Sequence, residues 1–310
     1  LRVFVKSEAQ ALGGAETMPL AALTASLTGK PGANDLLQFE VTGKIEAPLF
    51  IDYGGAGEAV FSRLAFIVRP NSAIDIIESH SASSGFSSAM LEFGIQAGGS
   101  VSRTILQDNG SESAAAITGS VTLSERASYN QTVLAFGAKL ARVETRVCYD
   151  GPGAKAVLNS AYLPKAGRHI DLTSLVRHGA ESCVTRQLTK GAISKGGKGI
   201  FQGKFHVPRT VGQYTDADMQ HQALLLDDGA EVFAKPELEI YADDVECAHG
   251  NTSGQLDEAA LFYMRQRGLP LNEARALLTE AFVNQALETA HPAVRDDLVG
   301  MTRDFLHAQA

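Results

Sequence analysis

A cysteine and a histidine two residues apart carry the clearest chemical signal in the sequence. Cys247 and His249 lie in the segment CAHG, shortly after the adjacent aspartates Asp243 and Asp244. Residues two apart in a strand point to the same face, so a strand over 245–249 brings the thiol and the imidazole together. These two groups suit soft or borderline metals such as zinc and iron.

The pair is too small to complete a metal site by itself. The other cysteines, Cys148 and Cys183, are distant in sequence, and two ligands do not close the coordination of a metal ion. A metal site here therefore needs ligands from distant residues or from another chain. The alternative is a strand end at which Cys247 packs as a small apolar group and His249 as a hydrogen-bonded ring.

Carboxylates suggest a different chemistry. A β-helix enzyme acting on acidic polysaccharide uses surface carboxylates as general acids and bases, and the candidates here are Asp216, Asp218, Asp227 and Asp243. Adjacent strand residues point to opposite faces, so Asp243 and Asp244 do not form a dyad. Solvated carboxylates in turns are the alternative.

Other motifs lack the pattern that catalysis requires. His80 lies in the serine-rich segment 78–85, which has no G-x-S-x-G elbow and is expected to be a flexible loop. The glycine-rich segment 191–199 lacks the register of a P-loop, so it predicts a turn. We therefore expect this chain to bind no nucleotide.

Composition and charge exclude several classes of partner. The 310 residues carry 27 Lys and Arg against 35 Asp and Glu, a formal net charge of −8, with no basic run suited to nucleic acid or to an anionic membrane. No apolar stretch is long enough to span a bilayer. Three widely spaced cysteines predict reduced thiols and a cytoplasmic protein.

The first residues are expected to be a lead-in to the main domain. The sequence begins at Leu1, without a methionine. We expect that something upstream was removed or lies outside this sequence, and that 1–34 is an N-terminal remnant or lead-in segment.

Residues 35–254 predict a β-rich core. Short apolar segments alternate with Gly, Asn and Asp at intervals of about a dozen residues. Alternation is clearest over 141–150, where one face carries Ala141, Val143, Thr145, Val147 and Tyr149. Many strands without intervening helices exclude a doubly wound fold and leave a sandwich, a barrel or a β-solenoid. The length of the pattern favours a parallel β-helix.

Residues 255–310 predict a helical domain of three amphipathic segments. Asp257 and Glu258 open the first, and Gly268 follows its end. A second follows Pro270, with Asn272 as the expected cap, and Pro292 opens the third. The fold class is therefore mainly β with α.

The segment 235–268, KPELEIYADDVECAHGNTSGQLDEAALFYMRQRG, resembles the signature of the SufB/SufD family of iron-sulfur cluster assembly scaffold proteins. The resemblance continues upstream through 168–179, 201–207 and 223–231. The chain is more similar to SufD than to SufB, because it has no tryptophan and lacks the tryptophan-containing and cysteine-bearing motifs associated with SufB.

The resemblance implies a right-handed parallel β-helix core followed by a C-terminal helical domain. It also implies a heterodimer with a SufB-like subunit through the β-helix bodies, and a SufC-like ABC ATPase docked on the C-terminal helices. Members of the family usually carry an N-terminal helical region before the β-helix, whereas 1–32 offers only a short piece.

The family's C-x-H-G segment implies a role for Cys247 and His249. Its histidine, which matches His249, lies near the interface of SufB and SufD and is implicated with a SufB cysteine in holding a nascent cluster. The preceding cysteine matches Cys247. The resemblance thus implies a transient iron-sulfur cluster whose remaining ligands come from the partner chain.

We therefore predict a non-catalytic scaffold subunit. A β-helix enzyme acting on polysaccharide remains the alternative, and a third possibility is a homo-oligomeric binding protein, since edge strands favour self-pairing when no SufB-like partner is present. Arg265, Arg267 and Glu273 are expected to border the ATPase-docking surface. The alternative for the helices is packing against their own β-body.

Overall fold

The computed structural model describes residues 2–6, 36–57 and 59–308. β1 (Arg2–Lys6) pairs antiparallel with β2 (Leu36–Val41), and the rest of the expected lead-in segment, 1–34, lies outside the described residues. No helix in these ranges combines the length and apolar character needed to cross a membrane.

From β2 onward, strands that follow one another in the sequence alternate between two sheets. The first, sheet A, has the order β1, β2, β4 (Val60–Val68), β6 (Ser84–Ile95), β8 (Glu112–Leu123), β10 (Leu140–Tyr149), β12 (His169–Arg177), β14 (Lys198–Val207) and β16 (Glu231–Ile240). The second, sheet B, has the order β3 (Leu49–Tyr53), β5 (Ala73–His80), β7 (Ser100–Gln107), β9 (Ser128–Ala135), β11 (Lys155–Tyr162), β13 (Val184–Ile193), β15 (Asp216–Leu225) and β17 (Glu246–Gly254).

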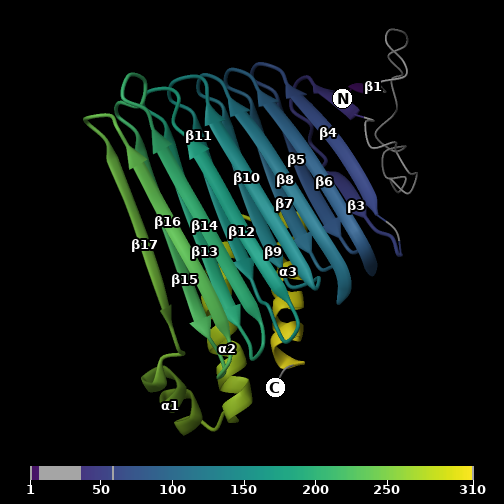
Figure 1. Cartoon of the computed structure of the whole chain (residues 1–310), viewed down its shortest axis with the longest axis vertical. Coiled ribbons are helices and arrows are strands. Elements are labelled where there is room, and N and C mark those ends of the chain that lie inside the picture. Colours follow the sequence, from purple (N-terminus) through teal and green to yellow (C-terminus); the bar gives the residue numbers. More distant parts are fainter. Residues whose placement is uncertain (1, 7–35, 58, 309–310) are drawn as a thin grey trace.

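From β4 to β15 each strand pairs in parallel with the strand one turn earlier and with the strand one turn later. Val143 of β10, for example, lies beside Ile117 of β8 and Leu172 of β12. The chain therefore winds into a parallel β-helix of about 8 turns (Figure 1). The predicted β-helix with C-terminal helices is confirmed.

The main core fills the space between the two sheets. In β10 the predicted alternation holds, because Ala141, Val143, Thr145, Val147 and Tyr149 are all buried. Equivalent side chains of successive turns stack on one another: the ring centroids of Phe39 and Phe66 are 4.6 Å apart, and those of Phe66 and Phe93 are 5.2 Å apart. Such offset stacking adds to the area that the rings remove from water.

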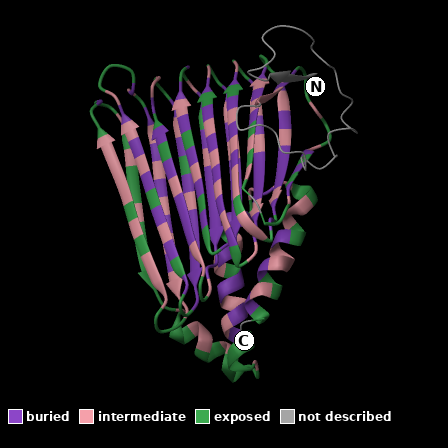
Figure 2. Cartoon of the chain, turned by 45° about the vertical axis from the view of Figure 1, so that its right-hand side comes forward, coloured by how far each residue is buried: buried purple, intermediate pink, exposed green. Residues whose placement is uncertain are grey.

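A second core lies between the outer face of sheet B and the C-terminal helices. α2 (Leu271–Asn284), η2 (Gln285–Leu287) and α3 (Pro292–His307) bury their apolar sides there. Strands β9, β11 and β13 are therefore buried on both faces over 131–135, 158–162 and 189–193. In Figure 2 the strands in the middle of the coil carry many buried residues, whereas β16 and β17 carry none.

The helix ends follow the sequence signals only in part. α1 (Glu258–Gln266) is capped by Asp257, whose carboxylate accepts from the backbone N–H groups of Ala259 and Ala260. α3 begins at Pro292 as predicted. The prediction that Asn272 caps the second helix is wrong, because α2 begins directly after Pro270 and has no side-chain cap.

A buried ion pair lies between the sheets near the first turns. The guanidinium of Arg103 contacts Glu78 at 2.5 and 3.0 Å, and His80 contacts the same carboxylate at 3.2 Å. Burial alone raises the pKa of Glu78, but the charge of Arg103 and the two hydrogen bonds outweigh it and lower that pKa to about 2. The expected flexible loop at His80 is wrong: His80 ends β5, is buried and stacks on Tyr53 at 4.4 Å.

The buried imidazole of His178 makes stability depend on pH. Burial lowers the pKa of His178 to about 4, from 6.5. The unfolded chain takes up this proton as the pH falls through 6.5 and the folded chain only near 4, so the free energy of unfolding should fall across that window by about 1.4 kcal/mol per pH unit, about 3 kcal/mol in all.

Urea unfolding of the wild type and of His178→Gln between pH 7 and pH 4 measures this contribution. The difference in unfolding free energy between the two proteins should shrink as the pH falls, while His169→Gln, on the outer face of β12, should follow the wild type. Parallel curves for His178→Gln and the wild type would contradict the prediction.

Candidate functional site

The candidate ligands lie on the last strand of the coil. β17 pairs with β15 on one side, and no described strand pairs with its other side. The strand begins at Glu246 and continues to Gly254. It therefore starts one residue later and extends further than the strand expected over 245–249.

Cys247 and His249 share a face that continues the interior of the coil. They lie beside Ala217 and Met219 of β15, both of which are buried in the main core. Cys247 is half-buried and packs against that core, whereas His249 is exposed. The structure thus places the two side chains on one face, at the open end of the β-helix.

The glycine after the histidine lies under a side chain of the neighbouring strand. A Cβ on Gly250 would come within 2.2 Å of Oε1 of Gln220 on β15. The amide of Gln220 in turn donates to Asp218 at 2.8 Å. The side chain of Gln220 therefore lies over the backbone of Gly250, directly after His249.

The electrostatics differ between the two candidate ligands. Burial raises the pKa of the Cys247 thiol, a backbone hydrogen bond with Ala217 opposes this shift, and the charge of Asp216 adds to it. A metal bound by this sulfur must displace a proton, because the thiolate is the ligand. His249 is exposed and offers an imidazole to whatever covers the open end.

In the part of the chain that the structure describes, no group of three or more His, Cys, Asp and Glu side chains is arranged to hold a metal ion. Cys247 and His249 supply two ligands to any such site.

Three of the four aspartates considered for catalysis contact a neighbouring side chain. Asp216 pairs with Arg186 at 2.5 Å, Asp218 accepts from Gln220, and Asp227 pairs with Arg275 at 3.1 Å. Asp243 is exposed in the connection before β17. These contacts hold Asp216, Asp218 and Asp227 to neighbouring side chains, and the polysaccharide enzyme is not favoured.

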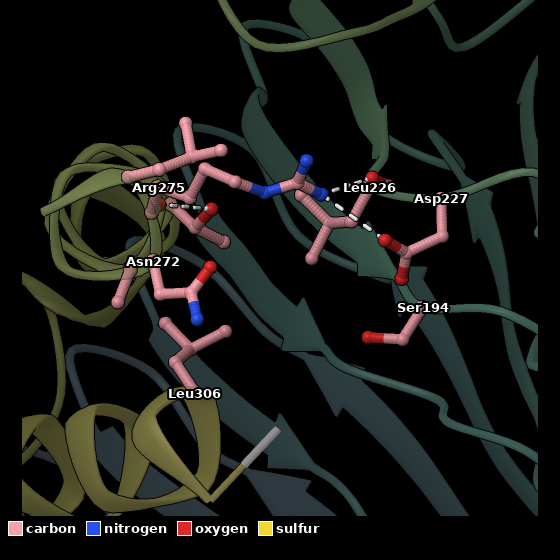
Figure 3. A pocket seen from close by; sticks show the side chains of 9 residues that line it. Ser194, Leu226, Asp227, Asn272, Arg275 and Leu306 are labelled. Carbon is pink, nitrogen blue, oxygen red and sulfur yellow. Dashed lines mark hydrogen bonds and ion pairs between the residues drawn. The ribbon is translucent and has the colours of Figure 1, made fainter. Parts of the chain in front are cut away.

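A cavity that the sequence did not indicate lies where the helices meet the coil. It has a volume of about 220 Å³ and is lined by Ser194, Leu226, Asp227, Leu271, Asn272, Arg275, Ala276, Thr279 and Leu306. Figure 3 shows Arg275 of α2 reaching across it to the carbonyl of Leu226 and the carboxylate of Asp227. Arg275 ties the helical domain to the connection between β15 and β16.

α1 contributes no buried residue to the fold. Phe262 is 65% exposed and Tyr263 is 59% exposed, and the guanidinium of Arg267 lies over the ring of Tyr263 at 5.1 Å. Arg265 and Glu273 are also exposed nearby in sequence. α1 therefore presents aromatic and charged side chains to solvent.

The sequence reasoning also missed Asn251, the next residue of β17 on the face of His249. Its amide oxygen lies 2.7 Å from Nδ1 of His221, which is buried inside the coil. Both residues lie on the common inner face because Asn251 pairs with His221 in the register of β17 and β15. No spacing rule within one strand indicates this contact.

The chain thus combines a parallel β-solenoid, a Cys-x-His pair on the open terminal strand and a helical domain folded back on one sheet. The family model described as "SUF system FeS cluster assembly, SufBD core domain" matches residues 50–282. The chain belongs to this SufB/SufD family, as the resemblance indicated, and is SufD-like.

Relatives in several organisms agree with this assignment. SufD of Escherichia coli K12 is 34% identical over 161 residues, which are 52% of this chain and 37% of the relative. Protein ABCI7, chloroplastic, of Arabidopsis thaliana is 29% identical over 273 residues, 83% of this chain and 57% of the relative. A SufBD family protein of Synechocystis, slr0076, is 29% identical over 238 residues, 73% and 52% respectively.

The shared segments amount to only part of each relative. The match spans 37% to 57% of the length of these three proteins. Membership of the SUF iron-sulfur assembly family is thus established for this chain, while the partners and activities of whole proteins are matters for proposal.

The different burial of the cysteines predicts their order of alkylation. Cys183 is fully buried, and burial raises its pKa to about 11. Because the thiolate is the reactive form, we expect iodoacetamide to leave Cys183 unmodified in the folded isolated chain and to modify half-buried Cys247 slowly. Peptide mapping by mass spectrometry, with native and urea-unfolded samples, gives the extent at each position. If iodoacetamide modified Cys247 no faster than Cys183 in the folded chain, the terminal face would not be open.

Proposed function

We propose that this chain is a non-catalytic scaffold subunit of a cytoplasmic iron-sulfur cluster assembly complex of the SufBCD type. In this proposal it pairs with a SufB-like subunit, and a nascent cluster is held where the two chains meet. The observation that carries the proposal is the common orientation of Cys247 and His249 on the open face of the terminal strand. The cluster is cargo that the complex builds and passes on.

The open end of the coil supports pairing with another β-body. An edge strand presents unpaired N–H and C=O groups, which favours the addition of strands from another chain. The interior residues Ala234, Leu238 and Cys247 are only partly buried at this end and pack against the main core from one side. A SufB-like β-helix would continue both sheets and cover these residues. A second copy of this chain is the occupant expected when the SufB-like subunit is absent.

Mixed ligation fits a site that must release its cargo. An imidazole from His249 beside thiolates of the partner chain provides a less sulfur-rich coordination than four cysteines, and ligand type and surroundings tune the stability of the cluster. Cys247 lies close enough along the strand to serve as a second ligand or as packing beside it.

The helical domain supports a second contact, with a SufC-like ABC ATPase. α1 leaves Phe262 and Tyr263 exposed, and aromatic residues rimmed by charges are typical of protein interfaces. In the proposal this chain binds no nucleotide, and ATP acts through the ATPase by moving the helical domains and thereby the interface between the scaffold chains.

The cluster role predicts a specific effect of removing the imidazole. We expect His249→Ala to lower the iron and acid-labile sulfide content of the complex about tenfold, because a ligand is removed. The complex of this chain with its SufB-like and SufC-like partners is purified anaerobically. Cys247→Ser should lower both contents less. Iron and sulfide are measured on complexes whose subunit ratio is unchanged.

His169→Ala is the matched control, because His169 lies on the outer face of sheet A and far along the coil from β17. Its complex should retain the wild-type content. If His249→Ala also retains that content, the pair has only a structural role and this chain does not hold the cluster.

The docking role predicts that exposed residues of α1 govern the affinity for the ATPase. Phe262→Ser and Arg265→Glu should each weaken binding about tenfold, or about 1.4 kcal/mol, without affecting the fold, because α1 buries no residue. Calorimetric titration measures the affinity, and Phe233→Ser, an exposed substitution on sheet A, is the control. Wild-type affinity in variants of Arg265, Arg267 and Glu273 would mean that the surface is wrongly placed.

A further inference from the structure

A chain of hydrogen bonds crosses the interior of the last turns and ends beside His249. The phenol oxygen of Tyr162 on β11 lies 2.8 Å from Nε2 of His221 on β15. Nδ1 of His221 lies 2.7 Å from Oδ1 of Asn251 on β17. Tyr162 and His221 are fully buried, so the hydrogen-bonded chain runs from the closed interior to the open end.

The surrounding residues hold His221 in one orientation. The ring of Phe201 stacks on it with centroids 4.6 Å apart and planes at 5°. Tyr162 reaches His221 because β13, which lies between their strands, carries Gly191 there: a Cβ on Gly191 would come within 2.6 Å of the Tyr162 phenol oxygen. The imidazole is thus fixed by a stacked ring on its face and by hydrogen bonds at both nitrogens.

The amide oxygen of Asn251 sets the donor and the acceptor in both hydrogen bonds of His221. An amide oxygen only accepts, so Nδ1 of His221 donates to Asn251. In the neutral ring Nε2 then accepts, and the O–H of Tyr162 donates to it. Burial lowers the pKa of His221, which agrees with a neutral imidazole. The amide oxygen of Asn251 therefore accepts the hydrogen bond from His221. The NH₂ group of the same side chain can donate to a ligand.

Asn251 lies on the face that carries the candidate ligands. Cys247, His249 and Asn251 pair with Ala217, Met219 and His221, whose side chains all point into the coil. Because β17 is the last described strand of its sheet, this face is open. The NH₂ group of Asn251 therefore belongs to the surface that a partner and its cargo would cover.

We propose that Asn251 donates a hydrogen bond to a sulfur atom of the cluster, and that His221 and Tyr162 are positioning residues that orient its amide. The proposal rests on the proposed function, since it assigns a further residue to the same face. Hydrogen bonds to cluster sulfurs raise the reduction potential and stabilise the bound cluster. Outer residues of this kind typically change metal affinity 10- to 100-fold.

Asn251→Leu tests the donor, because leucine has a similar size and no N–H. We expect the purified complex to assemble a cluster that has a lower reduction potential and loses iron to an added chelator about tenfold faster. Tyr162→Phe, which leaves Asn251 in place but removes one anchor of His221, should shift both quantities less and in the same direction. Thr252→Val, on the opposite face of β17, should leave both unchanged.

The outcomes separate this inference from the proposed function. Wild-type potential and iron loss in Asn251→Leu, with the cluster abolished by His249→Ala, would overturn the role of Asn251 alone. A shift in Asn251→Leu without any in Tyr162→Phe would overturn the positioning role of Tyr162. If His249→Ala retains iron and sulfide, the proposed function fails and this inference fails with it.

Discussion

Parallel pairing between residues one turn apart is the constraint on which the structure depends. It fixes the register of neighbouring strands, as where Val143 lies beside both Ile117 and Leu172, and so it decides which side chains stack inside the coil. The same rule leaves the final turn without a neighbour among the described strands. The open face that carries Cys247 and His249 is thus a consequence of how the coil is built and requires no separate loop.

The interior tolerates polar groups because the same register supplies their partners. Glu78 lies one turn from Arg103, and the fully buried pair combines a bidentate ion pair with a hydrogen bond to His80. The cost of removing two charges from water offsets much of their mutual attraction, whereas removing one partner would leave an unpaired buried charge. Tyr162 and His221 extend this polar pattern toward the end of the coil.

The sequence alone predicted best the strands that have one buried and one exposed face. Alternation in 141–150 was visible because one face of β10 meets water, whereas 158–162 in β11 is buried on both faces and loses that period. The Asn272 cap failed because the helix begins at Leu271, so Asn272 already lies inside the first turn and Pro270 is the N-cap residue. The common face of Cys247 and His249 followed from strand geometry. Asn251 did not, because its contact with His221 depends on a register set thirty residues away.

Because β17 pairs with a described strand on one side only, its free energy of local opening differs from that of the inner strands. Segments with few buried contacts open at a lower free energy than the rest of a structure, and β17 contains no buried residue. Its backbone hydrogen bonds to β15, the packing of Cys247 against the main core and the contact of Asn251 with His221 keep the strand in place. A chain added along its free edge would raise the free energy of that local opening. The local stability of β17 and the binding of the added chain would thereby be thermodynamically linked.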